Sequence, residues 1–243
     1  MKKTAMVTAL ITAFIAASAV SFAGPRSRQH SAAQIRVGGF FLEGGGEFWD
    51  ESESVFTLRT EDFDGGVLGL SFVSSINNNL EVGVNADFFE ESVPSAYSGF
   101  VDTAGFPIVH TARLQTTPLT VDVRLLPTGR HRIRGPRGHL VSKPVMYVGA
   151  GAGVNLWEYE EIGDFLDFGF DPAVIFFDRF RDRGAALEVH ALGGVEFPIG
   201  PSFNLLFEGR YSWSDDTLSD DFAGLGRIEL GGASAFAGAS FHF

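Results

Sequence analysis

Apolar and polar residues alternate with period two, and this pattern is the sequence feature that most constrains the fold of the chain. In the clearest segment, residues 80–88, apolar side chains occupy the even positions, and polar residues or glycine occupy the odd ones. A β-strand places two such sets on opposite faces, whereas a helix would scatter the charges around its circumference. The same pattern recurs, more or less strongly, over residues 35–43, 66–74, 119–125, 146–157, 186–197, 205–213 and 228–243. The chain is therefore predicted to be all-β, with eight strands.

The number and length of these strands favour a closed barrel. An even number lets an up-and-down antiparallel sheet close without leaving an edge. Most of the segments are about ten residues long, which is the length of a tilted strand that crosses a bilayer. Gly149, Gly151 and Gly153 fall on the polar face of their strand, where they leave room for larger side chains opposite. A soluble barrel would turn its apolar face inward and a membrane barrel would turn it outward, and alternation alone does not distinguish them.

Loop length and loop charge favour the membrane barrel. The connections at 75–79 and 198–202 are short, whereas every second connection is long, at about 44–65, 90–113, 158–185 and 214–227. Short turns on one rim and long loops on the other are typical of membrane barrels. Residues 43–64 hold eight acids and one base, and residues 127–144 on the opposite rim hold five bases and no acid. We therefore expect the long acidic loops outside the cell and 127–144 in the periplasm. The lipid-facing band is predicted to include Leu80, Val82, Val84, Leu119, Val121, Val123, Val148 and Phe207.

The first residues have the pattern of an export signal. Lys2 and Lys3 precede an apolar stretch at 5–20, and Ser21-Phe22-Ala23 supplies the small residues of a cleavage site. We expect a signal peptide at 1–23, a short extension at 24–34 and the barrel at 35–243. An N-terminal membrane anchor is the alternative, although the apolar run is short for a span.

Two further motifs carry a resemblance to a known family. Phe243 stands in a final strand with Phe241 on the same face, and Pro144–Gly151 reads P-x-x-Y-V-G-A-G. The chain resembles small eight-stranded bacterial outer-membrane proteins, a group that includes the OmpA/OmpX and OmpW-like proteins and related adhesion and opacity proteins. The resemblance implies an outer-membrane location among lipid and lipopolysaccharide, and assembly by an insertion machinery that reads Phe241 and Phe243. The length of 127–144 departs from the very short inner turns of that group.

Charged residues on the predicted inner face form the first candidate site. They are Glu81, Asp87, Asp122, Arg124, Glu188, His190, Glu196, Glu208 and Arg210. A lone buried charge would cost several kcal/mol, so the arginines are expected to pair with the acids, in part bidentately. The network is either a structural plug of ion pairs and water or a switchable gate in a narrow pore. A histidine on a barrel wall could also belong to a lipid hydrolase, but no hydrolase signature accompanies His190, and no enzyme is predicted.

Phenylalanines in the third long loop form the second candidate site. They are Phe165, Phe168, Phe170, Phe176, Phe177 and Phe180. Exposed loops rarely carry so much apolar surface without using it. These rings either cap the barrel mouth and extend its strands above the membrane, or form a port through which small apolar molecules enter, as the resemblance to OmpW-like barrels implies.

Composition excludes several other functions. The chain has no cysteine, which excludes disulfides, thiol catalysis and a zinc ribbon. Its formal net charge of -12 makes nucleic acid an unfavourable partner. The glycine run 149–153 resembles half of a dinucleotide motif, but no helix follows it, so no cofactor or metal is predicted. The leading prediction is passive, either passage of small molecules or envelope integrity. The alternative is a surface adhesion protein acting through its acidic loops, which could also bridge to lipopolysaccharide phosphates through divalent ions.

Overall fold

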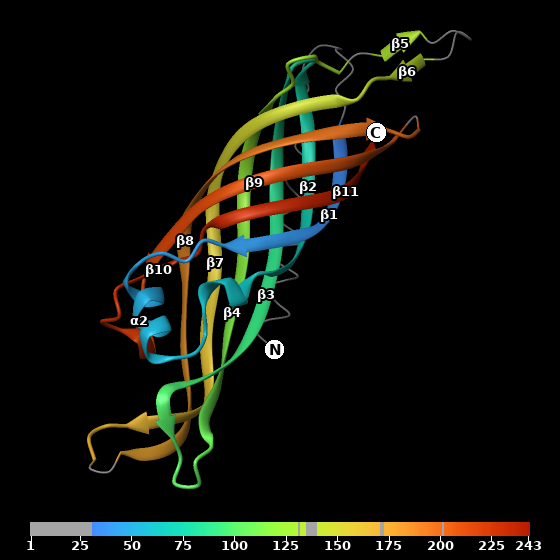
Figure 1. Cartoon of the computed structure of the whole chain (residues 1–243). Helices are drawn as coiled ribbons and strands as arrows, with labels where there is room; N and C mark the ends of the chain where they lie inside the picture. The colour runs from blue at the N-terminus through green and yellow to red at the C-terminus, as the bar shows by residue number, and fades with distance from the viewer. Residues whose placement is uncertain (1–30, 131, 135–139, 171–172, 201) are drawn as a thin grey trace, which may run out of the picture.

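Eight antiparallel strands form a closed ring in the computed structural model, which describes residues 31–130, 132–134, 140–170, 173–200 and 202–243 (Figure 1). The predicted signal peptide lies outside the described residues. The strands are β1 (Ser31–Leu42), β2 (Gly65–Asn77), β3 (Leu80–Val101), β4 (Pro107–Leu125), β7 (Val145–Asp167), β8 (Val174–Pro198), β9 (Phe203–Thr217) and β11 (Gly232–His242). Each pairs with its sequence neighbour in this list, and β1 pairs with β11 to close the ring. The predicted eight-stranded all-β barrel is confirmed.

Short elements fill the connections. The first long connection contains α2 (Glu47–Val55) and the 3-10 helix η1 (Thr60–Phe63). Beyond β4 lies the small hairpin β5 (Arg132–Arg134) and β6 (Leu140–Ser142), and the last connection contains η2 (Asp220–Phe222) and β10 (Arg227–Glu229). None of the helices within the described residues is long and apolar enough to cross a membrane. We call the rim with α2 and the long hairpins the hairpin end, and the opposite rim, which carries β5 and β6, the turn end (Figure 1).

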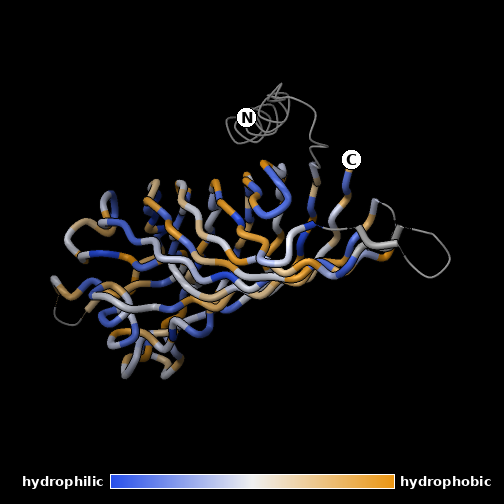
Figure 2. The backbone as a smooth tube through the Cα atoms, turned by 90° about the horizontal axis from the view of Figure 1, so that it is seen from above, coloured by the Kyte–Doolittle hydropathy of each residue, from blue (hydrophilic) through white to orange (hydrophobic). Residues whose placement is uncertain are grey.

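Polarity alternates along each strand of the ring, so orange and blue segments follow one another in Figure 2. In the half near the turn end, apolar side chains point outward: Val121, Val123, Val148 and Phe207 are all exposed. Leu80, Val82, Val84 and Leu119 also point outward and are partly exposed. The inward positions of the same strands carry buried charges. An apolar belt around a polar interior is the arrangement of a barrel surrounded by lipid.

The polarity inverts where four strands continue past the belt. The inward face of β3, β4, β7 and β8 becomes apolar, with Phe89, Leu114 and Trp157 buried. The outward face becomes charged, and Arg113 lies 3.6 Å from Glu90 on β3 and 3.0 Å from a carboxylate of β7. This half of the molecule is therefore built like a soluble β-structure, with an apolar core inside and most of its charges on the outer face.

This inversion corrects the expected loops. Residues 90–113 and 158–185 were predicted to be loops, but most of them are strand, and among the described residues only 102–106, 168–170 and 173 lie outside the strands. The four strands span 19 to 25 residues rather than about ten, and β7 pairs with β8 without a break from Val145 to Asp167. Two smaller differences concern the chain ends. The first strand begins at Ser31 rather than at 35, and the predicted strand 228–243 is divided at Leu230–Gly231 into β10 and β11.

Candidate functional site

The lumen beside the belt is crossed by a continuous set of ion pairs and hydrogen bonds, which we call the lumen network. Its members are Gln34, Arg36, Asn85, Asp87, Asp122, Arg124, Tyr147, Glu208 and Arg210. Because side chains alternate across each strand, several different strands supply these residues from inward positions. All of them are buried, and Arg36 has no solvent-exposed surface. The described side chains therefore fill the barrel at this level.

Each arginine of the lumen network contacts more than one acceptor. Arg36 bridges Asp87, at 2.8 Å, and Glu208. Arg210 bridges the same two carboxylates at 2.5 Å and 3.2 Å. Arg124 binds Asp122, two residues earlier on the same strand, through two parallel contacts of 2.9 Å and 3.1 Å. Such bidentate and bridging pairs offset the cost of removing the charges from water.

A second cluster closes the turn end. Arg130, which follows β4, reaches into the barrel and pairs with Glu81 from β3 and Glu196 from β8. Its contacts with Glu196 are bidentate, at 2.8 Å and 3.0 Å. His242 lies 3.1 Å from the same carboxylate. This arginine comes from the basic segment 127–144, and the side chains of 131–142 lie outside the described part of the structure.

Glu188 and His190 lie apart from these pairs. Nδ1 of His190 is 3.8 Å from Glu188, and neither ring nitrogen has a hydrogen-bond partner among the described residues. Ser212 is the cross-strand partner of His190, a neighbour that the sequence did not indicate. Gly151 lies opposite on β7, and a Cβ there would come within 2.7 Å of the imidazole ring, so this glycine leaves the space that the histidine fills. The serine and histidine are adjacent but not hydrogen-bonded, and the expectation of no enzyme stays a prediction.

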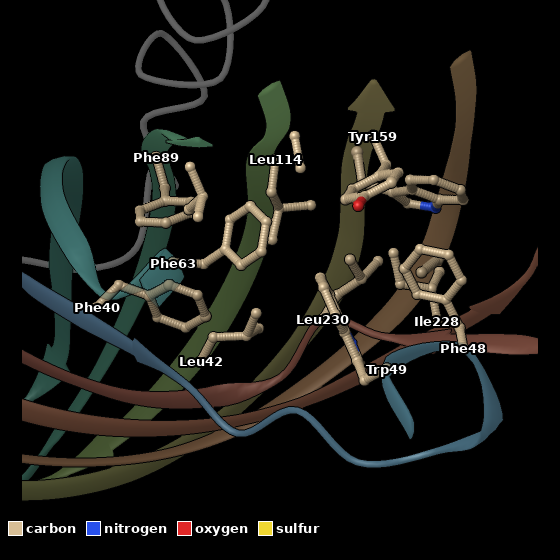
Figure 3. Packing of buried hydrophobic residues seen from close by; sticks show 14 of the residues in the cluster. Phe40, Leu42, Phe48, Trp49, Phe63, Phe89, Leu114, Tyr159, Ile228 and Leu230 are labelled. Carbon is tan, nitrogen blue, oxygen red and sulfur yellow. The ribbon is translucent and has the colours of Figure 1, made fainter. Parts of the chain in front are cut away.

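An aromatic core covers the lumen network on the hairpin-end side. Figure 3 shows Phe48 and Trp49 of α2 and Phe63 of η1 pointing toward Tyr159 and Leu114 of the long strands. Phe236 forms the boundary, because Arg36 stacks on its ring at 4.8 Å to the centroid. A cavity of about 30 Å³ remains between the two layers, lined on the polar side by Asp87, Asn155, Glu188 and Arg210 and on the apolar side by Phe40, Phe89 and Phe236. This volume is close to that of one water molecule.

The structure divides the six predicted loop phenylalanines into two groups. Phe165, Phe176 and Phe180 turn inward, and Phe165 is buried against Tyr97 and Ile108. Phe168, Phe170 and Phe177 are exposed, by 60%, 62% and 70%. The predicted set is thus half core and half surface, because strand parity and a turn at 168–170 separate its members.

Two titratable groups are enclosed in the hairpin-end half, outside the belt. His110 is 3% exposed, contacts the ring of Phe56 at 4.4 Å between centroids, and has no hydrogen-bond partner for either nitrogen among the described residues. This burial lowers its pKa to about 4. Glu161, on the neighbouring strand, is 4% exposed, and its burial raises its pKa to about 7 despite a 2.7 Å hydrogen bond from the Tyr159 hydroxyl. Sequence analysis identified neither residue.

Comparison with known proteins gives only structural similarities. The chain matches no known protein-family model and no curated protein. It is similar to a major outer membrane protein of Thermus thermophilus, with 11% identity, a TM-score of 0.47 and coverage of 88% of this chain and 99% of that one. It is also similar to Neisserial surface protein A, with 12% identity, a TM-score of 0.45 and coverage of 89% and 98%. Ail, the attachment invasion locus protein of Yersinia pestis, matches with 12% identity, a TM-score of 0.43 and coverage of 88% and 98%.

Proposed function

We propose that this protein is a bacterial outer-membrane barrel that acts by contact at the cell surface, through the sheet that projects beyond its belt. The observation that carries the proposal is the contrast between the two halves. The lumen is filled by buried ion pairs and covered by an aromatic core, while four strands extend past the belt and end in exposed phenylalanines. A long sheet outside the membrane, combined with a lumen that has no open passage among the described residues, favours a protein that acts by binding at the surface.

The apolar belt and the predicted signal peptide support the outer-membrane location. The acidic hairpin end would face outward, beside lipopolysaccharide, and the basic turn end would face the periplasm. Assembly by the barrel insertion machinery, with Phe241 and Phe243 as its signal, belongs to the same proposal. Both rings point outward, and Phe241 packs at 5.2 Å from Phe203.

The filled lumen favours a structural plug over a gate. Opening it would separate several charge pairs at once, each with little access to water. The division of the loop phenylalanines into inward and exposed groups also disfavours passage through the barrel. The inward rings belong to a packed core instead of lining a port, so uptake of small apolar solutes is the weaker of the two functions.

Two measurements on the same protein test the proposal. Full-length protein refolded in planar bilayers should give no steady conductance, and its liposomes should swell no faster than empty ones in arabinose. Bacteria that display the protein should attach to cultured epithelial monolayers in greater numbers than bacteria that lack it. Replacing residues 98–106 and 166–175 by short Gly-Asn turns should abolish this increase in attachment. A steady conductance, or attachment that ignores the shortened hairpins, would refute the contact function.

A further inference from the structure

The two projecting hairpins end side by side in one composite surface. The rings of Phe100 and Phe168 lie 5.5 Å apart between centroids, and the Leu166 amide donates a 3.3 Å hydrogen bond to the Tyr97 hydroxyl. We call the exposed apolar residues here the tip surface. They are Phe100, Val101, Phe106, Val109, Phe168, Phe170, Val174, Ile175 and Phe177. Exposed apolar side chains gathered in this way, well outside the belt, are typical of a surface that binds a partner.

The charge of the tip surface is predominantly negative, although the exposed Arg179, which lies 3.7 Å from Glu160, borders it on β8. Within the described tip residues, 97–109, 164–170 and 173–178, the charged side chains are Asp102, Asp164, Asp167 and Asp178, with no lysine or arginine. The neighbouring cleft continues this pattern, since Glu43, Glu53 and Glu61 line it together with one arginine. Exposed apolar rings with carboxylates among them favour a partner that is apolar and cationic at once.

These features exclude several other occupants. A second copy would bring aspartates against aspartates, and an anionic membrane would be repelled in the same way. A small apolar solute could cover the rings, but it would leave neighbouring carboxylates partly desolvated without a counter-charge. Lysine or arginine side chains would pair with those carboxylates and could also stack on the phenylalanine rings.

We propose that the tip surface binds a cationic amphipathic polypeptide segment, one whose apolar face is flanked by lysine or arginine. This inference rests on the proposed contact function and specifies the chemistry of its partner. The long strands would hold the surface clear of the membrane, where such a segment can dock on the rings while its basic residues reach the aspartates.

The aspartates can be neutralised without altering the turns. Oδ1 of Asp102 accepts hydrogen bonds from the amides of Ala104 and Phe106, both at 2.8 Å. Oδ1 of Asp167 accepts a 2.8 Å hydrogen bond from the Gly169 amide. Asparagine retains this oxygen, so aspartate-to-asparagine changes remove charge and keep the local hydrogen bonds.

The test uses full-length protein in phosphatidylcholine nanodiscs and three fluorescent 18-residue peptides. One is a Leu/Lys amphipathic helix, one is its Leu/Glu counterpart, and one carries the Leu/Lys residues in scrambled order. The protein variants are a charge variant (D102N, D164N, D167N and D178N), a ring variant (F168S and F177S) and a control, I76S, which removes an exposed apolar side chain at the turn end. Binding is measured by anisotropy above an empty-nanodisc baseline.

The Leu/Lys helix should bind wild type and I76S equally, and at least about tenfold more weakly to the charge and ring variants. Raising the salt from about 0.05 M to 0.5 M should weaken wild-type binding and leave the charge variant nearly unchanged. Equal binding of the Leu/Glu helix, or undiminished binding to both variants, would overturn the inference. The comparison of the peptides on the wild-type protein does not depend on whether the variants fold. If the peptides fail to discriminate while cell attachment still requires the hairpins, the partner chemistry is wrong and the contact function stands.

Discussion

The two titratable groups enclosed in the hairpin-end half should give opposing contributions to stability. His110 is expected to have a pKa of about 4 when folded and 6.5 when unfolded. The unfolded chain therefore binds the extra proton, and stability is lost as pH falls below 6.5. Glu161 is expected to have a pKa of about 7 when folded and 4.5 when unfolded, so its protonated form is favoured by folding, and stability is lost as pH rises from 4.5 to 7.

Each pKa differs by about 2.5 between the two states, which corresponds to about 3 kcal/mol for each group. Between pH 4.5 and 6.5 the two slopes have opposite signs and nearly equal size, so their sum in the wild type should be almost flat. Single substitutions should expose each slope separately. In Glu161→Gln, which keeps an acceptor for Tyr159, the free energy of unfolding should rise by about 3 kcal/mol from pH 4 to 6.5. In His110→Leu it should fall by about 3 kcal/mol from pH 4.5 to 7.

Tryptophan fluorescence offers a local probe for this test. Trp49 and Trp157 are buried in the aromatic core, whereas Trp213 points outward from the belt, so a Trp213→Phe background leaves only the core reporters. Urea unfolding of protein in vesicles would then be followed across the pH range. In the double variant, the free energy of unfolding should not change across this pH range. The expected titration would be refuted if the free energy of unfolding of the wild type changed steeply with pH, or if that of the single variants did not change. Either result would show that these side chains do not titrate as buried groups.

Three further predictions concern the belt, the lumen network and assembly. Val123→Arg places a charge on the lipid face and should lower the free energy of unfolding in vesicles by about 2–4 kcal/mol, unless the belt has been misassigned. Arg36→Met removes one of the two arginines that bridge the buried Asp87 and Glu208 and should cost about 3–5 kcal/mol by urea unfolding, whereas Arg113→Met, whose side chain is partly exposed on the outer face, should cost less than about 1 kcal/mol; equal costs would contradict the plug. Deleting Phe243 should lower the yield of barrel in cell membranes but leave the in-vitro unfolding midpoint nearly unchanged, and unchanged yields would remove its role as an assembly signal.

Strand parity explains how much of the lumen was predictable. Once 119–125 and 205–213 were assigned, the positions of Arg124 and Glu208 followed from alternation. Arg36 follows from the same rule, since Ile35 and Val37 flank it on the opposite face, but it was missed. The position of Arg130 could not be predicted from alternation, because this residue lies beyond the end of β4 and meets Glu81 and Glu196 only in the folded protein.

The hairpin-end half was less predictable for a physical reason. Alternation was used with the apolar face outward, and beyond the belt the apolar face turns inward, so the predicted strands ended too early in β3 and β7 and began too late in β4 and β8. The acids of 158–164 then indicated a loop, although Glu158 and Glu160 stand on the outer face of a continuing strand. Phe48 and Trp49 were overlooked among acidic neighbours. Their burial depends on α2 folding across the barrel mouth, which no local pattern encodes.

The unbroken pairing of β7 with β8 has a mechanical consequence. Backbone hydrogen bonds run from Val145 near the turn end to Asp167 at the tip, through both the belt and the projecting half. A pull on the tip would stretch β7 and β8 together, so the ladders that join this pair to β4 and β9 would be loaded in shear, and many bonds would share the force instead of breaking one after another. The same sheet that presents the tip would then act as its tether, and a load applied outside the cell would be carried by the part of the barrel held in the membrane.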